Sequence, residues 1–253
     1  MTPPSTEQMP LKRKPRAVIF DTDNTLYPYD PAHKAAITAT VEKATEILGI
    51  SADRFQQTFD EARRSIKKTL GDTASSHSRL LYFQRAIEML GLRTQVLATL
   101  DLEQTYWRTF LTNSWLFPEV KEFLFDLKSN GILTAIITDM TAQIQFRKLI
   151  YFGLEDMFDY VVTSEESGRD KPHAHPFEMA LQKLNVAPEL IWMIGDSSLA
   201  DMAGAHALRM LKLQKTHAGV SVDKSGPGMP DMSFEHFSTL RKLFRKLPDN
   251  GIV

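Results

Sequence analysis

The chain has 253 residues, of which 43% are hydrophobic and 24% charged, and its net charge is −1. This composition is typical of a globular protein with a sizeable core, and it gives no basic excess to favour nucleic acid or an anionic membrane surface. The absence of cysteine excludes disulfides and thiolate chemistry and suits a reducing compartment. No run approaches the roughly 18 apolar residues that span a bilayer. We therefore expect a cytoplasmic monomer or homodimer with no nucleic-acid or membrane partner.

The hydrophobic period changes after the first predicted strand, at residues 17–20. Between about residues 32 and 112, apolar residues recur at intervals of three and four, with glycines at the breaks. This spacing predicts four helices and no strand. We expect residues 30–115 to form a four-helix cap domain, inserted between the first strand and the rest of the chain.

Helical stretches alternate with short apolar runs in the second half of the chain. The runs predict buried strands at residues 132–137, 160–163, 190–194 and 210–213. The alternation predicts an α/β fold, a doubly wound (Rossmann-like) parallel sheet with helices on both faces. Residues 16–29 and 116–253 would form this core domain, and residues 1–15 a flexible leader.

Several of the predicted strands are followed by polar residues that could do chemistry: Asp21, Asp23, Thr138, Asp139, Lys171, Asp196 and Asp201. The carboxyl ends of parallel strands meet at one crevice, so we expect these side chains to converge. Two carboxylates separated by one residue repel each other unless a cation neutralises them or one is protonated. A divalent metal and an acid/base pair would meet both conditions. Carboxylates, a hydroxyl and an ammonium group together match phosphoryl transfer, with Mg²⁺ as the metal.

Four short motifs occur in the expected order along residues 17–247. They are Asp21-Thr22-Asp23-Asn24-Thr25, Thr138, Lys171-Pro172, and Gly195-Asp196 followed by Asp201. With these motifs the sequence resembles the haloacid dehalogenase superfamily, and within it the phosphatases that carry a helical cap after the first motif.

The resemblance implies hydrolysis of a small phosphorylated metabolite through an aspartyl-phosphate. By position, Asp21 is expected to be the nucleophile and Asp23 the acid and base. Mg²⁺ is expected to bind to the carboxylates of Asp21 and Asp196 and to the main-chain carbonyl of Asp23. Asp201 is expected to orient the metal ligands or Lys171 without binding the metal itself. The founding dehalogenases lack the second aspartate of the first motif, so Asp23 favours a phosphatase.

The resemblance places Thr138, Asp139 and Lys171 at the phosphate. Asp139 stands where relatives frequently have Asn. A carboxylate facing the phosphate would repel it, so we expect this side chain to turn away or the residue to bind through its main-chain N–H. Asn24 likewise replaces the frequent Gly of the first motif.

Two other functions fit the same motifs. One is a phosphotransferase or phosphomutase of the same superfamily, which hands the phosphoryl group to another hydroxyl. The other is a non-catalytic binding or regulatory protein on this fold, which the presence of Asp23 disfavours. Nucleotides, sugar phosphates and flavin phosphates all remain open as substrates.

The predicted cap carries a group of basic residues: Arg63, Arg64, Lys67, Lys68, His77 and Arg79. We interpret this group as a solvated helix face. Contact between one or two of these residues and a substrate anion is the less favoured hypothesis.

Overall fold

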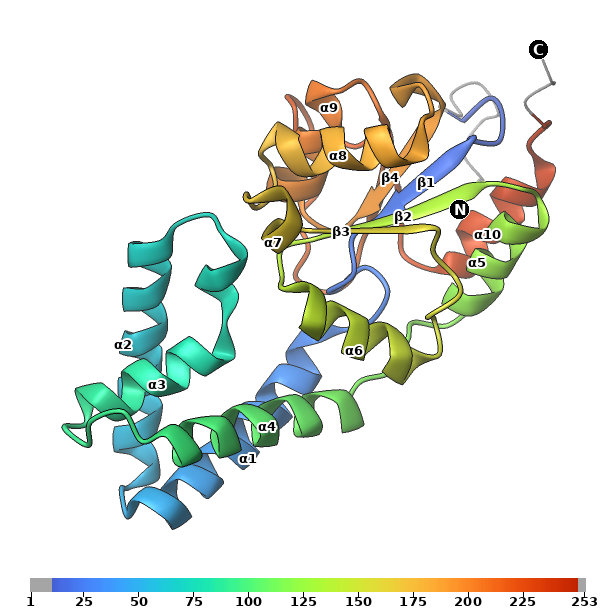
Figure 1. The fold of residues 1–253 in the computed structure, drawn as a ribbon. Coiled ribbons are helices and arrows are strands. Elements are labelled where there is room, and N and C mark those ends of the chain that lie inside the picture. Colours follow the sequence, from blue (N-terminus) through green and yellow to red (C-terminus); the bar gives the residue numbers. More distant parts are fainter. Residues whose placement is uncertain (1–10, 250–253) are drawn as a thin grey trace.

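Six parallel strands form one sheet in the computed structural model, which describes residues 11–249 (Figure 1). The order across the sheet is β3-β2-β1-β4-β5-β6. The strands are β1 (Ala17–Phe20), β2 (Leu133–Thr138), β3 (Tyr160–Thr163), β4 (Ile191–Gly195), β5 (Leu211–Lys215) and β6 (Met232–Phe234). The predicted α/β fold with a parallel sheet is therefore confirmed.

Strand β1 is fully buried, because β2 and β4 pair with its two edges and helices pack on both of its faces. Its side chains alternate between two hydrophobic clusters, with Val18 and Phe20 in one and Ala17 and Ile19 in the other. Helices α8 and α9 cover one face, and α5 and α10 cover the other (Figure 1). This two-sided burial explains why the strand is a continuous apolar run.

The helices and helical turns that follow residue 116 connect these strands. They are α5 (Val120–Ser129), α6 (Ala142–Phe152), α7 (Ser164–Ser167), α8 (Ala174–Leu184), η2 (Pro188–Leu190), the π-helical turn η3 (Ser198–Met202), α9 (Ala203–Ala207) and α10 (Phe237–Lys246). The strands from β1 to β5 are thus joined by helical crossovers, whereas residues 216–231 join β5 to β6 without a helix.

Four helices and one short 3₁₀ turn lie between β1 and α5, and we call them the helical insert (residues 29–112). They are α1 (Tyr29–Leu48), α2 (Ala52–Leu70), η1 (Ala74–His77), α3 (Arg79–Met89) and α4 (Val96–Thr112). The insert extends away from the sheet, with α1 packed along α4 and α2 along α3 (Figure 1). The two connections to the sheet run together, because the Phe117 N–H donates to the carbonyl of Leu26 at 2.9 Å. The division into domains at residues 29/30 and 115/116 stays a prediction.

The helix limits follow from local sequence. Ser78 precedes α3, and its hydroxyl accepts a hydrogen bond from the Leu81 N–H at 3.3 Å, which satisfies one of the free donors at a helix start. Gly49 ends α1 in the left-handed conformation (φ 65°), which glycine adopts without steric cost. None of the helices within residues 11–249 is long and apolar enough to cross a membrane.

Two parts of the chain differ from the sequence analysis. Strand β6 was not predicted, because three residues with one exposed side chain are too short to show a strand period. Of the expected leader, residues 1–10 lie outside the described residues. Within residues 11–15, Leu11 is buried in the core, and the Lys14 N–H donates to the carbonyl of Pro248 at 3.0 Å, whereas Lys12 and Arg13 are exposed.

Helices α8 and α9 approach closely at Gly204. A Cβ atom added there would lie 2.3 Å from Cε2 of Phe177. We predict that Gly204→Ala lowers the free energy of unfolding by about 1–3 kcal/mol, because a packed core resists added volume. Urea unfolding of the variant measures this. Adding Phe177→Leu should recover part of the lost free energy of unfolding. If the double variant loses as much as the two single variants together, the contact between residues 204 and 177 does not cause the effect.

Candidate active site

The register of the sheet brings three strand ends to one point. Phe20 pairs with Ile136 of β2 and with Ile194 of β4. Asp21 follows Phe20 directly, while Thr138 and Asp196 each lie two residues beyond the paired positions. The three predicted side chains therefore lie side by side at the carboxyl edge of the sheet, where ligands bind in open parallel sheets.

Lys171 joins two of the buried carboxylates. Its Nζ donates to Asp21 Oδ1 at 2.6 Å and to Asp201 Oδ1 at 2.7 Å, and its side chain is 3% exposed. Burial alone would lower the pKa of Lys171, but the carboxylates of Asp201 and Asp21 raise it well above its usual value. Lys171 is therefore a fixed positive charge beside Asp21.

The carboxylates at this edge form a group that suits a hard cation. Ligand atoms of Asp21, Asp196 and Asp201 all lie within 4.8 Å of one another. Asp201 is already engaged by Lys171 and by the Ser197 N–H, at 3.0 Å. Asp21 and Asp196 thus fit as metal ligands, and Asp201 fits the supporting position that the sequence predicted.

The charge of these carboxylates exceeds what Lys171 can balance. Burial, and then repulsion from Asp21 and Asp201, raises the pKa of Asp196 to about 8. Burial also raises the pKa of Asp21 to about 6, although Lys171 opposes the change. A divalent cation between Asp21 and Asp196 would remove this repulsion.

Asp23 is held by two groups that the sequence analysis did not identify. Its Oδ1 accepts a hydrogen bond from Lys148 Nζ at 2.8 Å and another from the hydroxyl of Tyr27. Burial would raise the pKa of Asp23, but Lys148, the Tyr27 hydroxyl and the charge of Arg79 together outweigh it, and the pKa falls below its usual value. The resting carboxylate is thus ionised and fixed in direction.

Lys148 lies in a nearly closed apolar environment. The side chain is 1% exposed, and Nζ lies 5.3–5.6 Å from the ring centroids of Tyr27, Trp107 and Phe110. Two of these rings belong to α4 of the helical insert, so Lys148 links Asp23 to the insert. The sequence did contain a sign that Lys148 is buried. It lies four residues from both Ile144 and Phe152, so it belongs to the buried face of α6.

The phosphate-site candidates lie together as predicted. Thr138 is buried beside Thr22, and Lys171 is one strand end away. The carboxylate of Asp139 accepts a hydrogen bond from the Lys171 N–H at 2.8 Å. Asp139, which stands where relatives frequently have Asn, thus has one carboxylate oxygen occupied by a main-chain hydrogen bond.

Asn24 has the left-handed conformation (φ 62°), which explains why glycine is frequent at this position. Its side-chain oxygen accepts a hydrogen bond from the Tyr29 N–H at 2.9 Å, at the start of α1. Asn tolerates this conformation better than most residues do. The replacement therefore preserves the turn and adds a contact to the helical insert.

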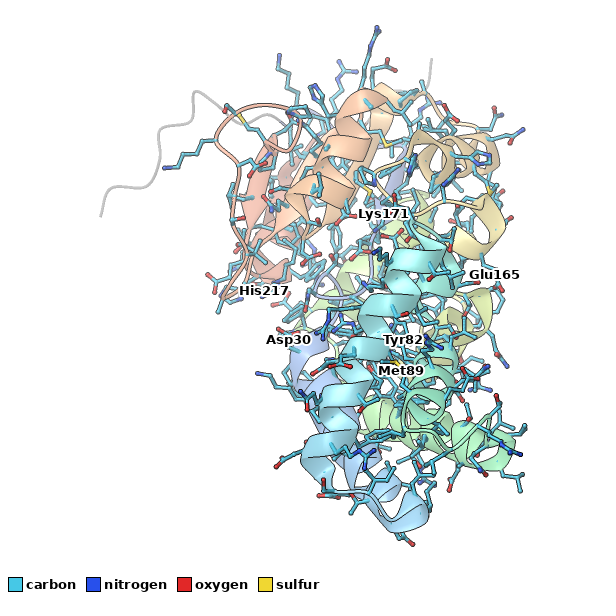
Figure 2. The ribbon with its side chains drawn as sticks, turned by 90° about the vertical axis from the view of Figure 1, so that its left-hand side faces the viewer. Asp30, Tyr82, Met89, Glu165, Lys171 and His217 are labelled. Carbon is cyan, nitrogen blue, oxygen red and sulfur yellow. The ribbon has the colours of Figure 1, made fainter. Side chains whose placement is uncertain are left out.

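A cavity of about 280 Å³ lies between the sheet edge and the helical insert. Figure 2 shows Lys171 at this boundary and Tyr82 farther into the insert. The insert contributes Tyr29, Arg63, Lys67, His77, Arg79 and Tyr82 to the lining. Arg63 and Lys67 are exposed, as the interpretation of a solvated basic face expects, but together with the half-buried Arg79 they also line the cavity. Arg64 and Lys68 are exposed and do not line it.

A family model for a haloacid dehalogenase-like hydrolase matches residues 15–209. The chain belongs to this family. The resemblance seen in the sequence motifs is therefore confirmed.

Two relatives match about three quarters of this chain. The chain is 41% identical to the ribulose-1,5-bisphosphate 5-phosphatase of Halopiger xanaduensis over 194 residues, 76% of this chain and 81% of that one. It is 30% identical to the glyceraldehyde 3-phosphate phosphatase of Methanothermobacter thermautotrophicus over 195 residues, 75% of this chain and 80% of that one. Both relatives are named as phosphatases.

Solved structures of other family members have the same fold. A haloacid dehalogenase-type phosphatase from Thermococcus onnurineus matches with a TM-score of 0.69 at 24% identity, and covers 91% of this chain and 98% of its own. A 2-haloacid dehalogenase from Pseudomonas syringae matches with a TM-score of 0.72 at 23% identity, with the same coverage. The fold is thus shared by proteins named for different reactions. The reaction of a given chain must therefore be inferred from the residues of its site, not from the fold.

We predict that Asp23 and Lys148 stabilise the fold as a pair. Lys148→Met removes the cation that pairs with the Asp23 carboxylate, and Asp23→Asn leaves a buried ammonium among aromatic rings without its carboxylate, so each should destabilise the protein. The double variant should recover a coupling energy of about 1–3 kcal/mol. Urea unfolding of the wild type, both single variants and the double variant measures this cycle.

The exposed pair of Lys43 and Glu46, 3.3 Å apart on α1, supplies a matched control. Lys43→Met should change the free energy of unfolding by less than about 1 kcal/mol, because solvent screens exposed pairs. Strictly additive effects of the Asp23 and Lys148 substitutions would contradict the pairing.

Proposed function

We propose that this chain is a Mg²⁺-dependent phosphatase that hydrolyses a small phosphomonoester through an aspartyl-phosphate on Asp21. The observation that carries the proposal is the buried Asp21 carboxylate, bound by Lys171 at 2.6 Å, with Asp23 two residues farther at the same cavity. The phosphatase names of the relatives support it. The cytoplasmic location and the monomeric or homodimeric state remain predictions.

The residues divide the reaction into two steps. In the first, an Asp21 oxygen attacks phosphorus and the ester P–O bond breaks. Asp23, whose resting carboxylate is ionised and must first take up a proton, gives that proton to the leaving oxygen. In the second, Asp23 takes a proton from water, whose oxygen attacks the aspartyl-phosphate and restores Asp21. Lys171 and Thr138 bind phosphate oxygens throughout.

The carboxylates of Asp21 and Asp196 and the main-chain carbonyl of Asp23 would hold Mg²⁺. When bound, the ion supplies positive charge that lets an anionic carboxylate approach an anionic phosphate. Asp201 keeps Lys171 pointed at Asp21 and is itself fixed by the Ser197 N–H. The protein thus positions the nucleophile before the substrate arrives.

Among the substrates that the sequence left open, we propose a short phosphorylated sugar. The relatives are named for ribulose 1,5-bisphosphate and glyceraldehyde 3-phosphate, both of this class. A cavity of about 280 Å³ suits a metabolite of that size, since sites for drug-sized ligands start at about 300 Å³.

We predict that Asp21→Asn lowers kcat for p-nitrophenyl phosphate by at least about 10³-fold, because the amide is a poor nucleophile. Removal of Mg²⁺ by EDTA should abolish wild-type activity, and added Mg²⁺ should restore it. Release of nitrophenolate measures both effects, with circular dichroism as the control for folding. A near wild-type rate for this variant would disprove the proposed mechanism.

We predict that Asp23→Asn separates the two steps. Nitrophenolate leaves without a proton donor, so the aspartyl-phosphate still forms, but its hydrolysis lacks a base and slows by about 10²–10⁴-fold. Rapid mixing should show a burst of about one nitrophenolate per enzyme, and mass spectrometry should find the phosphoryl group on Asp21. Wild-type turnover that needs an added hydroxyl acceptor, and that places the phosphoryl group on this acceptor without releasing inorganic phosphate, would instead indicate a phosphotransferase.

A further inference from the structure

Three cations of the helical insert face the cavity from the side opposite the sheet. Arg63 and Lys67 are one turn apart on α2, and Arg79 begins α3. Within residues 11–249, none of the three forms an ion pair with a carboxylate. Arg63 and Lys67 are exposed to solvent and Arg79 is half-buried, and all three line one cavity. Three charges of one sign are thus gathered around one cavity, an arrangement that favours a bound anion.

Arg79 is fixed in place by neutral groups. Its guanidinium donates to the carbonyl of His77 at 2.7 Å and to the hydroxyl of Tyr29. It also lies 5.6 Å from the ring centroid of Tyr82 and 5.3 Å from that of Tyr106. These contacts orient the side chain and leave its positive charge uncompensated, which is how an anion-binding arginine is prepared.

The three charges affect one another and their neighbours. Burial, and then repulsion from Arg63 and Arg79, lowers the pKa of Lys67. Burial, and then the same two arginines, lowers the pKa of His33 to about 4. The insert side of the cavity is therefore a region of strong positive potential, which a bound anion would relieve.

The sheet side has the opposite charge. Five carboxylates and one lysine line the cavity there. One of the carboxylates, Asp139, accepts a hydrogen bond from the Lys171 N–H. The proposed function assigns the other four and the lysine to the reacting phosphate, its metal and its leaving group. The cations of the insert remain without a role. A substrate that spans the cavity would place a second group against them, at the end away from the reacting phosphate.

We propose that Arg63, Lys67 and Arg79 bind a second phosphate of the substrate, so that the preferred substrates are short-chain bisphosphates. This inference rests on the proposed function and names the substrate class of the same site. Two guanidinium groups and one ammonium match a phosphate dianion better than a carboxylate, because they offer more charge and more donors than two oxygens use.

The test compares matched esters on the wild type. The pairs are a pentulose 1,5-bisphosphate with the pentulose 5-phosphate, and 3-phosphoglycerate with glycerol 3-phosphate. We expect kcat/KM for the bisphosphate to exceed that for the monophosphate by at least about tenfold, since a hydrogen bond to a charged group contributes about 1.5–3 kcal/mol. The carboxylate pair should differ less. A larger preference in the carboxylate pair would overturn the assignment to phosphate.

The variants Arg63→Gln, Lys67→Gln and Arg79→Gln should each reduce the ratio of the two kcat/KM values, mainly by raising KM for the bisphosphate. Arg64→Gln and Lys68→Gln are matched controls, because these neighbours on α2 do not line the cavity. They should leave the ratio within about twofold of wild type.

The outcomes separate this inference from the proposed function. If the wild type hydrolyses the bisphosphate and the monophosphate with equal kcat/KM, and the Lys67 variant has the same ratio, the second-phosphate site is overturned. The proposed phosphatase activity would still stand. An enzyme that hydrolyses none of the esters in Mg²⁺ would overturn the function itself. A ratio that falls equally in the Lys68 control would show that the effect is not specific to the cavity.

Discussion

The structure of the site depends on the ammonium of Lys171, which lies between Asp21 and Asp201. The sheet places buried carboxylates side by side at its edge, and like charges at that spacing destabilise the fold unless a cation lies between them. Lys171 supplies that charge from a separate loop. The surrounding backbone adapts to it: a Cβ on Gly195 would lie 2.3 Å from Asp201 Oδ2, so only glycine leaves room for that carboxylate. Fold and chemistry thus use the same contacts.

A second buried lysine connects the site to the helical insert. Lys148 contacts Asp23 on the sheet side and the rings of Trp107 and Phe110 on the insert side. Tyr27, where the chain leaves the sheet, contacts the same carboxylate. The direction of the Asp23 side chain is therefore set by residues from both parts of the protein. A displacement of α4 would change the surroundings of Lys148, and through it those of Asp23.

Much of the fold and site could be predicted because the signals were local. The limits of β1 agree with the prediction, since four apolar residues ended by an aspartate mark a buried strand. Asp21, Thr138, Lys171 and Asp196 were found because each follows a strand and parallel strands end at one edge.

The residues that were missed depend on packing between distant segments. Lys148 looks like an ordinary helix residue until α4 is placed against α6, because its ring contacts come from residues about 40 and 120 positions away. Arg63 and Lys67 were interpreted as a solvated face for the same reason, since only tertiary structure turns one edge of α2 toward the cavity. Strand β6 was missed because three residues carry no period.

In the proposed reaction, the distribution of charge across the cavity would assign selectivity to the insert. The sheet edge would bind the phosphate, which every phosphomonoester shares, so its residues would not distinguish one ester from another. The leaving group would extend away from phosphorus, toward the side where the insert lies. The insert is held there by the Asp170 N–H, which donates to the carbonyl of Asp72 at 3.1 Å, and by His77, whose ring lies 2.9 Å from the Asp170 carboxylate. These contacts join η1 to the loop that carries Lys171. They fix the position of the insert cations, which would bind the leaving group, relative to the lysine that would bind the phosphate.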